Sequence, residues 1–262
     1  MLRIEQLKLN LNEPTSKIPE KIAKQLGISP PEKWKIIRES IDARDKSHLH
    51  FIYTVDFEAT NEKVVLKKAL RRKNIKIRAV DIKPYELPYS CYKENANNVS
   101  ENDRPVIVGF GPCGMFAALI LAQAGMRPVV FERGRRIEER IADVERFWNT
   151  GILDPESNVQ FGEGGAGTFS DGKLTTGIKD SRIAKVNSEF IKAGADESIA
   201  YVNMPHIGTD VLRKVVINIR KKIIALGGEV RFESKLTGLN IEKDKIYNIM
   251  INDSEKIGRA HV

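Results

Sequence analysis

The chain has 262 residues, 41% hydrophobic and 30% charged, which is the composition of an ordinary globular protein and excludes a collagenous or disordered one. Its longest apolar run, 115–122, falls well short of the roughly 18 residues of a membrane span, so we expect no membrane association. The formal net charge is +8, and nearly all of the excess Lys and Arg lies in residues 1–100. The two parts of the chain therefore differ chemically.

The N-terminus and the cysteine usage indicate a cytoplasmic protein. Arg3, Glu5 and Lys8 interrupt the start of the chain, which leaves no apolar core for a secretory signal. Two cysteines, Cys91 and Cys113, fit a reducing compartment, and we expect no disulfide between them.

The first part of the chain predicts alternating strands and helices. Apolar and polar residues alternate from Leu49 to Phe57, which is the period of a half-buried strand. Apolar residues four apart predict a helix over 17–26, closed by Gly27, and a second helix is expected after Asn61. Weaker strands are predicted at 2–11, 34–44 and 75–82, although 34–44 is equally compatible with a helix. The resulting order, βαββαβ, predicts a small α+β ferredoxin-like domain over residues 1–95.

A segment rich in Asn, Ser and other turn formers lies between Pro84 and Arg104 and has no apolar periodicity. It predicts a linker, which we assign to residues 96–103. The second domain is then expected over residues 104–256.

The second domain predicts a strand, a helix and a second strand, at 106–108, 112–123 and 128–132. Further elements follow from apolar spacing and from the Gly227-Gly228 stop. They are helices at 136–148, 181–193 and 209–226, and strands at 229–239 and 245–251.

The turn between the first strand and helix of this domain carries the pattern Gly109-x-Gly111-x-x-Gly114. In such a turn the first glycine permits a tight bend, the second lets the backbone approach a pyrophosphate, and the third lets the helix pack closely on the strand. Glu132 follows 18 positions after Gly114, where a carboxylate accepts hydrogen bonds from ribose hydroxyls and repels a 2′-phosphate. The pattern predicts an adenine-dinucleotide site, against the alternative of a merely tight turn.

With Ala118, Gly125, Arg133 and Gly134 at their spacings, this pattern resembles the FAD-binding signature of the glutathione-reductase-type flavoproteins. The segments 158–174 and 205–210 more narrowly resemble a family of uncharacterised FAD-dependent (NAD(FAD)-utilising) dehydrogenases. The resemblance implies an oxidoreductase with an incomplete Rossmann-type FAD-binding domain, and NAD(P)H as a candidate electron donor. The cofactor-binding residues that we assign are Gly109, Phe110, Gly111, Pro112, Cys113, Gly114, Glu132, Arg133, Gly164, Gly165 and Leu236.

Several of these assignments have plain structural alternatives. The glycines of 162–172 suit either backbone approach to a ligand or a surface loop, and Leu236 suits either an adenine contact or a core strand. Arg133 and Arg140 could reach the adenosine or pyrophosphate. Cys113 has no CxxC partner, which argues against disulfide-reductase chemistry.

Family members are about twice as long, and their C-terminal Gly-Asp signature is missing here. Residues 257–262 also resemble translated adapter sequence, so we expect a C-terminally truncated chain with a non-native tail, inactive alone. No catalytic residue can be named from the pattern, and the four histidines have no zinc-ligand spacing.

A second hypothesis concerns the basic first domain. Its cationic run could bind nucleic acid, which would make the protein an RNA-associated flavoprotein, although a solvated helix face explains such a run equally well. The run consists of Lys67, Lys68, Arg71, Arg72, Lys73, Lys76 and Arg78. A small-molecule substrate is expected in either case.

Overall fold

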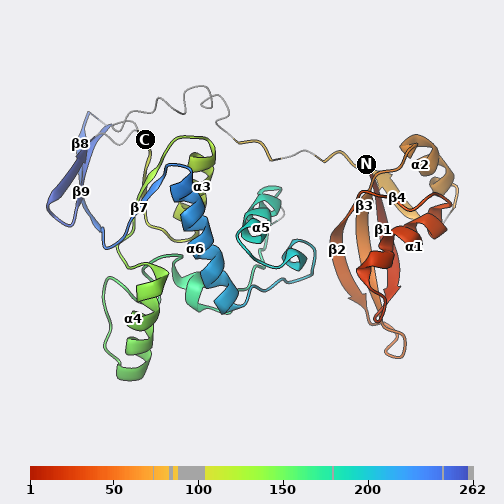
Figure 1. Ribbon diagram of the computed structural model, residues 1–262, viewed down its shortest axis with the longest axis horizontal. Helices are drawn as coiled ribbons and strands as arrows, with labels where there is room; N and C mark the ends of the chain where they lie inside the picture. The colour runs from red at the N-terminus through yellow and green to blue at the C-terminus, as the bar shows by residue number, and fades with distance from the viewer. Residues whose placement is uncertain (73, 83–84, 88–103, 179, 244, 259–262) are drawn as a thin grey trace. The chain divides into compact units, whose positions relative to one another are not determined.

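A computed structural model describes residues 1–72, 74–82, 85–87, 104–178, 180–243 and 245–258. The expected linker at 96–103 and most of the expected tail at 257–262 lie outside these residues. Two compact units are present (Figure 1). Unit 1 comprises residues 1–84 and 197–205, and unit 2 comprises 85–196 and 206–262.

Unit 1 is built on a four-stranded antiparallel sheet with the strand order β2-β3-β1-β4. Its elements are β1 (Leu2–Asn10), η1 (Thr15–Lys17), α1 (Ile18–Leu26), β2 (Trp34–Asp42), β3 (His50–Phe57), α2 (Glu62–Leu70) and β4 (Lys76–Ala79). The element order is the predicted βαββαβ. The helical alternative for 34–44 is wrong, because β2 pairs along its length with β3, from Trp34 opposite Phe57 to Asp42 opposite His50.

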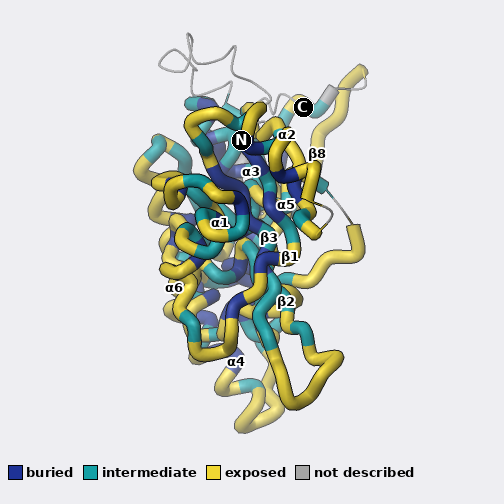
Figure 2. The backbone as a smooth tube through the Cα atoms, turned by 90° about the vertical axis from the view of Figure 1, so that its right-hand side faces the viewer, coloured by how far each residue is buried: buried dark blue, intermediate teal, exposed yellow. Residues whose placement is uncertain are grey.

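A bulge in β1 keeps its apolar residues on one face. Leu2 and Ile4 are buried, the register shifts before Leu7, and Leu7 and Leu9 are then buried in turn. A strand alternates its faces every residue, so an uninterrupted strand would expose one of these two pairs. Gln6, with φ of 60°, supplies the extra position. Figure 2 colours the buried positions dark blue.

The segment 197–205 also belongs to unit 1, although the residues on both sides of it in the sequence, 85–196 and 206–262, belong to unit 2. It begins with η6 (Glu197–Ala200), and Tyr201 packs against the core of unit 1. The carbonyl of Tyr201 accepts a hydrogen bond from the backbone N–H of Glu39, with an N–O distance of 2.8 Å. Strand β2 is an edge strand of the sheet, and Glu39 follows its register shift, which lies between Ile36 and Arg38.

Unit 2 contains a three-stranded parallel sheet with the order β5-β6-β7, made by β5 (Val106–Val108), β6 (Val129–Phe131) and β7 (Glu229–Arg231). The remaining elements are α3 (Pro112–Gln123), α4 (Ile137–Thr150), η5 (Ala166–Phe169), α5 (Arg182–Lys192), α6 (Thr209–Ala225), β8 (Leu236–Glu242), β9 (Lys245–Ile251) and β10 (Glu255–Gly258). Strands β8, β9 and β10 form a separate antiparallel sheet. The protein is thus of mixed α/β class with a parallel sheet.

The single strand predicted at 229–239 is wrong. Strand β7 ends at Arg231, the chain turns through Glu233 at a positive φ of 52°, and β8 begins at Leu236 in the other sheet. Strand β7 pairs in parallel with β6, whereas β8 pairs antiparallel with β9, so the apolar pattern on the two sides of Glu233 belongs to two different sheets.

Helices α3 and α6 lie side by side in unit 2 (Figure 1). Helix α3 buries small and apolar residues, among them Met115 and Ala118, while α6 buries an apolar stripe from Leu212 to Ile223. This packing fixes the first turn of α3 at the carboxyl end of β5. Within the residues that the structure describes, no helix is long and apolar enough to cross a bilayer.

Candidate functional site

The turn from Gly109 to Gly114 joins β5 to α3, where the sequence predicts it. Gly109 has a positive φ of 90°, and Gly111 is the N-cap of α3, followed by Pro112 at the first helical position. A Cβ built on Gly109 or Gly111 would meet no atom within 4 Å, whereas one on Gly114 would overlap the carbonyl oxygen of Gly109. Gly114 therefore brings the helix onto the strand, and the other two glycines leave open space beside the backbone.

Glu132 follows β6 and is almost completely buried, with 4% of its surface exposed. One carboxylate oxygen, Oε2, accepts a hydrogen bond from the N–H of Phe110 at 2.7 Å. The other, Oε1, accepts from Gly134 at 2.8 Å and from Gly162 at 3.0 Å. Since a carboxylate has about four acceptor positions, Glu132 has about one left for a ligand.

A glycine-rich segment, residues 158–165, rests against the turn, and we call it the glycine loop. The N–H of Gly164 donates to the carbonyl of Phe110 at 2.9 Å. Gly165 has a φ of 65°, and a Cβ on it would stand 3.2 Å from Cα of Gly111 and from Cδ of Pro112. The structure thus brings the predicted Gly165 to the start of α3, while Gly164 contacts the turn through its backbone.

Gly164 needs to be a glycine for a different reason from Gly165. Its φ is 79°, and a Cβ there would overlap the hydroxyl of Thr168 and approach the methyl groups of Val216 on α6 within 3.3 Å. Packing inside unit 2 accounts for this glycine.

Arg140 of α4 is fully buried, so it does not reach the open side of the turn. Its guanidinium donates four hydrogen bonds to backbone carbonyls of the glycine loop, those of Asn158, Val159, Glu163 and Gly165. Desolvation lowers the pKa of Arg140 to about 10, which still leaves it charged at neutral pH.

Arg133 lies in a network of paired charges beyond the end of β6. It bonds Glu156 at 2.6 Å, and its guanidinium carbon lies 4.1 Å from the centre of the Phe161 ring. Lys235 bonds the same carboxylate at 2.9 Å, and these contacts hold the pKa of Glu156 below its ordinary value, the Lys235 hydrogen bond having the largest effect. Arg133 and Lys235 line a polar hollow of about 300 Å³.

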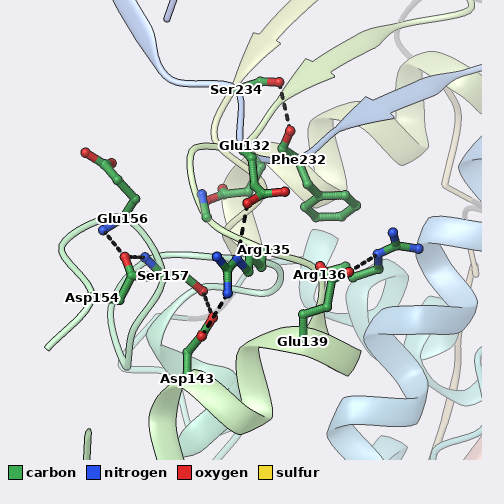
Figure 3. A network of polar contacts seen from close by, with 12 residues as sticks. Glu132, Arg135, Arg136, Glu139, Asp143, Asp154, Glu156, Ser157, Phe232 and Ser234 are labelled. Atoms are coloured by element: carbon green, nitrogen blue, oxygen red, sulfur yellow. Dashed lines mark hydrogen bonds and ion pairs between the residues drawn. The ribbon is translucent and has the colours of Figure 1, made fainter. Parts of the chain in front are cut away.

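Figure 3 shows the neighbouring part of this network. Arg135 reaches Asp143 at 3.0 Å, and the same carboxylate accepts the hydroxyl hydrogen bond of Ser157 at 2.6 Å. Asp154 accepts from the backbone N–H groups of Glu156 and Ser157, and the bond from Glu156 contributes most to lowering its pKa. These pairings order the chain that leads into the glycine loop.

The remaining predicted residues lie at the edges of the site. Cys113 is an exposed free thiol in the first turn of α3. Leu236 begins β8 and packs, partly buried, against a small core that contains Val129, Phe131 and Ile249. This packing fits the core-strand alternative for Leu236, and the adenine contact stays a prediction.

Sequence reasoning missed Glu163, a completely buried carboxylate of the glycine loop. Its Oε2 accepts from the N–H of Ile137, at the start of α4, at 2.9 Å, and lies 3.2 Å from Nη1 of Arg220. Its Oε1 has no hydrogen-bond partner, and desolvation raises its pKa to about 7. In the sequence, a glutamate between glycines looks like a solvated loop residue. Only the structure shows that Glu163 is buried and connects the glycine loop to α4 and α6.

Comparison with known sequences finds similarity without a described function. A family model described as a domain of unknown function, DUF8436, matches residues 1–58. An "Uncharacterized protein" of Clostridium beijerinckii is 44% identical over 253 residues, which are 96% of this chain and 46% of that protein. The chain thus spans a little under half of the length of this relative.

Comparison with solved structures finds distant likenesses. THI4 of Thermovibrio ammonificans is 17% identical, with a TM-score of 0.35, over 74% of this chain and 57% of that one. An oxidoreductase of Methanosarcina mazei is 13% identical, with a TM-score of 0.30, over 60% of this chain and 57% of that one. The Diels-Alderase PyrE3 is 18% identical, with a TM-score of 0.33, over 59% of this chain and 30% of that one.

Proposed function

We propose that unit 2 is the adenosine-diphosphate-binding part of an FAD-dependent oxidoreductase with a Rossmann-type fold. One observation carries the proposal: the β5-turn-α3 segment leaves open space at Gly109 and Gly111 while the carboxylate of Glu132, from the neighbouring parallel strand, bonds the turn at Phe110. A dinucleotide-binding site requires backbone without side chains at the N-terminus of a helix, and an acidic residue after the next strand.

The diphosphate would lie across the first turn of α3. The backbone N–H groups there lack intrahelical partners, and the helix dipole adds a partial positive charge at the same place. A side chain at Gly111 would occupy the open space beside this backbone. The chain can therefore stabilise two phosphates without a basic side chain in contact with them.

The ribose would be bound by Glu132. Three of its acceptor positions are taken by backbone N–H groups, so we infer one hydrogen bond to a ribose hydroxyl and not two. A buried carboxylate at this place also repels a 2′-phosphate, which favours FAD or NAD over NADP as the nucleotide held by this turn.

When bound, a flavin supplies hydride and electron transfer chemistry. The described residues of this chain would bind and orient the nucleotide half of the cofactor: the turn would hold the diphosphate, Glu132 would hold the ribose, and the glycine loop would close one side. The resemblance supports a dehydrogenase with NAD(P)H as a candidate donor and a small molecule as its substrate. The low cysteine content supports a cytoplasmic location.

The experiment is a calorimetric titration of the full chain with ADP, the part of FAD that the turn would hold. We expect Gly111→Val to abolish ADP binding, because its side chain fills the space beside the turn. Gly177→Val is the matched control, since a Cβ there also meets no atom within 4 Å and Gly177 is not part of the turn, and this variant should bind like the unaltered chain. Equal affinity of the Gly111→Val and Gly177→Val variants would contradict the proposal.

A hollow on unit 1 favours a second function, binding of RNA. It has a volume of about 1240 Å³, and four of its lining side chains are cations, Lys8, Lys21, Lys24 and Arg44, against one carboxylate, Asp42. Neutralising Lys8 and Lys24 should then weaken RNA binding and reduce its dependence on salt. If only neutralising Lys67 and Lys68 on α2 has this effect, the hollow is not the site, and if neither has it, RNA binding is dismissed.

A further inference from the structure

We infer that Arg140 is a positioning residue that holds the glycine loop as one wall of the diphosphate site. The inference rests on the proposed function of unit 2 and adds to it a residue that makes no contact with the nucleotide. It is carried by the hydrogen bonds of the guanidinium and by the contact between the loop and the glycine turn.

The guanidinium of Arg140 donates hydrogen bonds to both ends of the glycine loop. Its Nε donates to Asn158 at 2.8 Å, and its Nη2 donates to Val159 and Gly165 at 2.9 Å each. Its Nη1 donates to Glu163 at 2.6 Å. All four acceptors are backbone carbonyls, so the side chain fixes the path of the loop backbone itself.

Only arginine has the geometry for this task. The guanidinium offers five N–H donors in one plane, of which four are used here, whereas the lysine ammonium offers three donors from a single point. The guanidinium carbon also lies 4.7 Å from the centre of the Phe169 ring, where the cation gains from the aromatic face. Lysine would keep the charge and lose most of the bonds.

Two buried charges hold the glycine loop at Gly162. The N–H of Gly162 donates to Glu132, and a Cβ on Gly162 would stand 2.8 Å from Nε of Arg140. The carboxylate of Glu132 thus accepts a hydrogen bond from an N–H group of the loop, while the guanidinium of Arg140 donates to carbonyls of the same loop. The same carboxylate bonds the glycine turn at Phe110, so the loop and the turn share one anchor.

The wall meets the turn at Gly165. Its carbonyl is bonded to Arg140, and a Cβ on it would stand 3.2 Å from Cα of Gly111. Loss of the guanidinium would take one donor from each of the four carbonyls, and those of Glu163 and Gly165 would keep only their 3.3 Å bonds from Thr168. The loop would have to move to restore the lost bonds. Movement of Gly165 changes the space beside Gly111, where the diphosphate would lie.

The test compares ADP with AMP, because only ADP has the second phosphate. Both nucleotides are titrated into the full chain, into the Arg140→Lys variant and into Arg146→Lys, a control on the more exposed side of the same helix. We expect Arg140→Lys to weaken ADP binding about tenfold more than AMP binding, and Arg146→Lys to leave the ratio of the two affinities unchanged. A general loss of stability would lower both affinities together and would not move this ratio.

The outcomes separate this inference from the proposed function. An unaltered chain that binds neither nucleotide refutes the proposed function. If the unaltered chain binds ADP more tightly than AMP, and the Arg140→Lys variant has the same ratio of the two affinities, only the role of Arg140 is refuted. If the lysine variant does not fold, Arg140→Ala purified with millimolar guanidinium replaces it. Guanidinium should then restore ADP binding where ammonium does not, and equal effects of the two cations would overturn the inference.

Discussion

Alanine substitutions at Gly114 and Gly111 separate two roles of the glycine turn, which are close packing of the helix on the strand and open space beside the backbone. In Gly114→Ala the new methyl group overlaps the carbonyl oxygen of Gly109, and it lies 3.1 Å from the carbonyl carbon and 3.3 Å from Cγ2 of Ile107. Backbone atoms cannot rotate away, so the start of α3 must move off β5. In Gly111→Ala the methyl group meets no atom, and the φ of −71° suits any residue.

The two changes should therefore differ in their cost to stability. Overpacking costs about 1–3 kcal/mol, and the better helix propensity of alanine offsets at most about 1 kcal/mol of this for Gly114→Ala. We expect a net loss of about 1–2 kcal/mol, or a fall in Tm of roughly 2–8 °C. In Gly111→Ala, alanine stabilises the protein by restricting the unfolded chain and destabilises it as a poorer N-cap residue. The two effects roughly cancel, so the free energy of unfolding should stay within about 0.5 kcal/mol of that of the unaltered chain.

The assay is thermal unfolding of both variants without nucleotide, followed by titration with ADP. Gly111→Ala should unfold like the unaltered chain yet bind ADP at least about tenfold more weakly, because its methyl group fills the open side of the turn. A Gly111→Ala variant that loses as much stability as Gly114→Ala, or that binds ADP normally, would refute the assignment of open space at Gly111.

Three further predictions concern buried carboxylates. Burial raises the pKa of Glu163 from 4.5 to about 7, so its stabilisation is complete below pH 4.5 and is lost as the pH rises to about 7. Glu163→Gln should remove this pH dependence of about 3 kcal/mol from denaturant midpoints, and an unchanged profile would contradict the burial argument. Asp56→Ala should lower the free energy of unfolding by about 2 kcal/mol, because Arg3 loses the carboxylate that it bonds at 2.6 and 2.8 Å. A double-mutant cycle with Arg3→Met measures the coupling energy of this pair, and a value near zero would contradict the prediction. Glu132→Gln should cost about 1–3 kcal/mol in urea unfolding, because an amide nitrogen cannot accept the N–H bonds now made to the carboxylate; a variant as stable as the unaltered chain would show that these bonds contribute little.

The secondary structure could be predicted well where one local pattern decides it. Helix α1 begins and ends within a residue of its prediction, because apolar spacing and Gly27 both determine it. Strand β3 lies within a residue of its predicted range, although Asp56, on the side predicted to be polar and exposed, is buried. The predicted strand at 229–239 failed because a single positive φ at Glu233 separates two sheets, and a glutamate gives no sign of this in the sequence.

The candidate site could be predicted only in part. The glycines of the turn are recognisable because their spacing follows from backbone geometry, and Glu132 because an acid is expected on the next strand. The bonds that Glu132 accepts from Phe110 and Gly162, and the four carbonyl bonds of Arg140, could not be predicted, because they join residues 18 or more positions apart in the sequence. The placement of 197–205 in unit 1 likewise depends on tertiary packing that no local pattern encodes.

The proposed function requires that this protein bind FAD through the turn at Gly109–Gly114. The most direct measurement is the visible absorption spectrum of the protein purified from its complete gene, with chromatography of the cofactor that heat releases. We expect the two bands of oxidised flavin and about one FAD per chain. A colourless protein that takes up no FAD when the cofactor is added would contradict the claim.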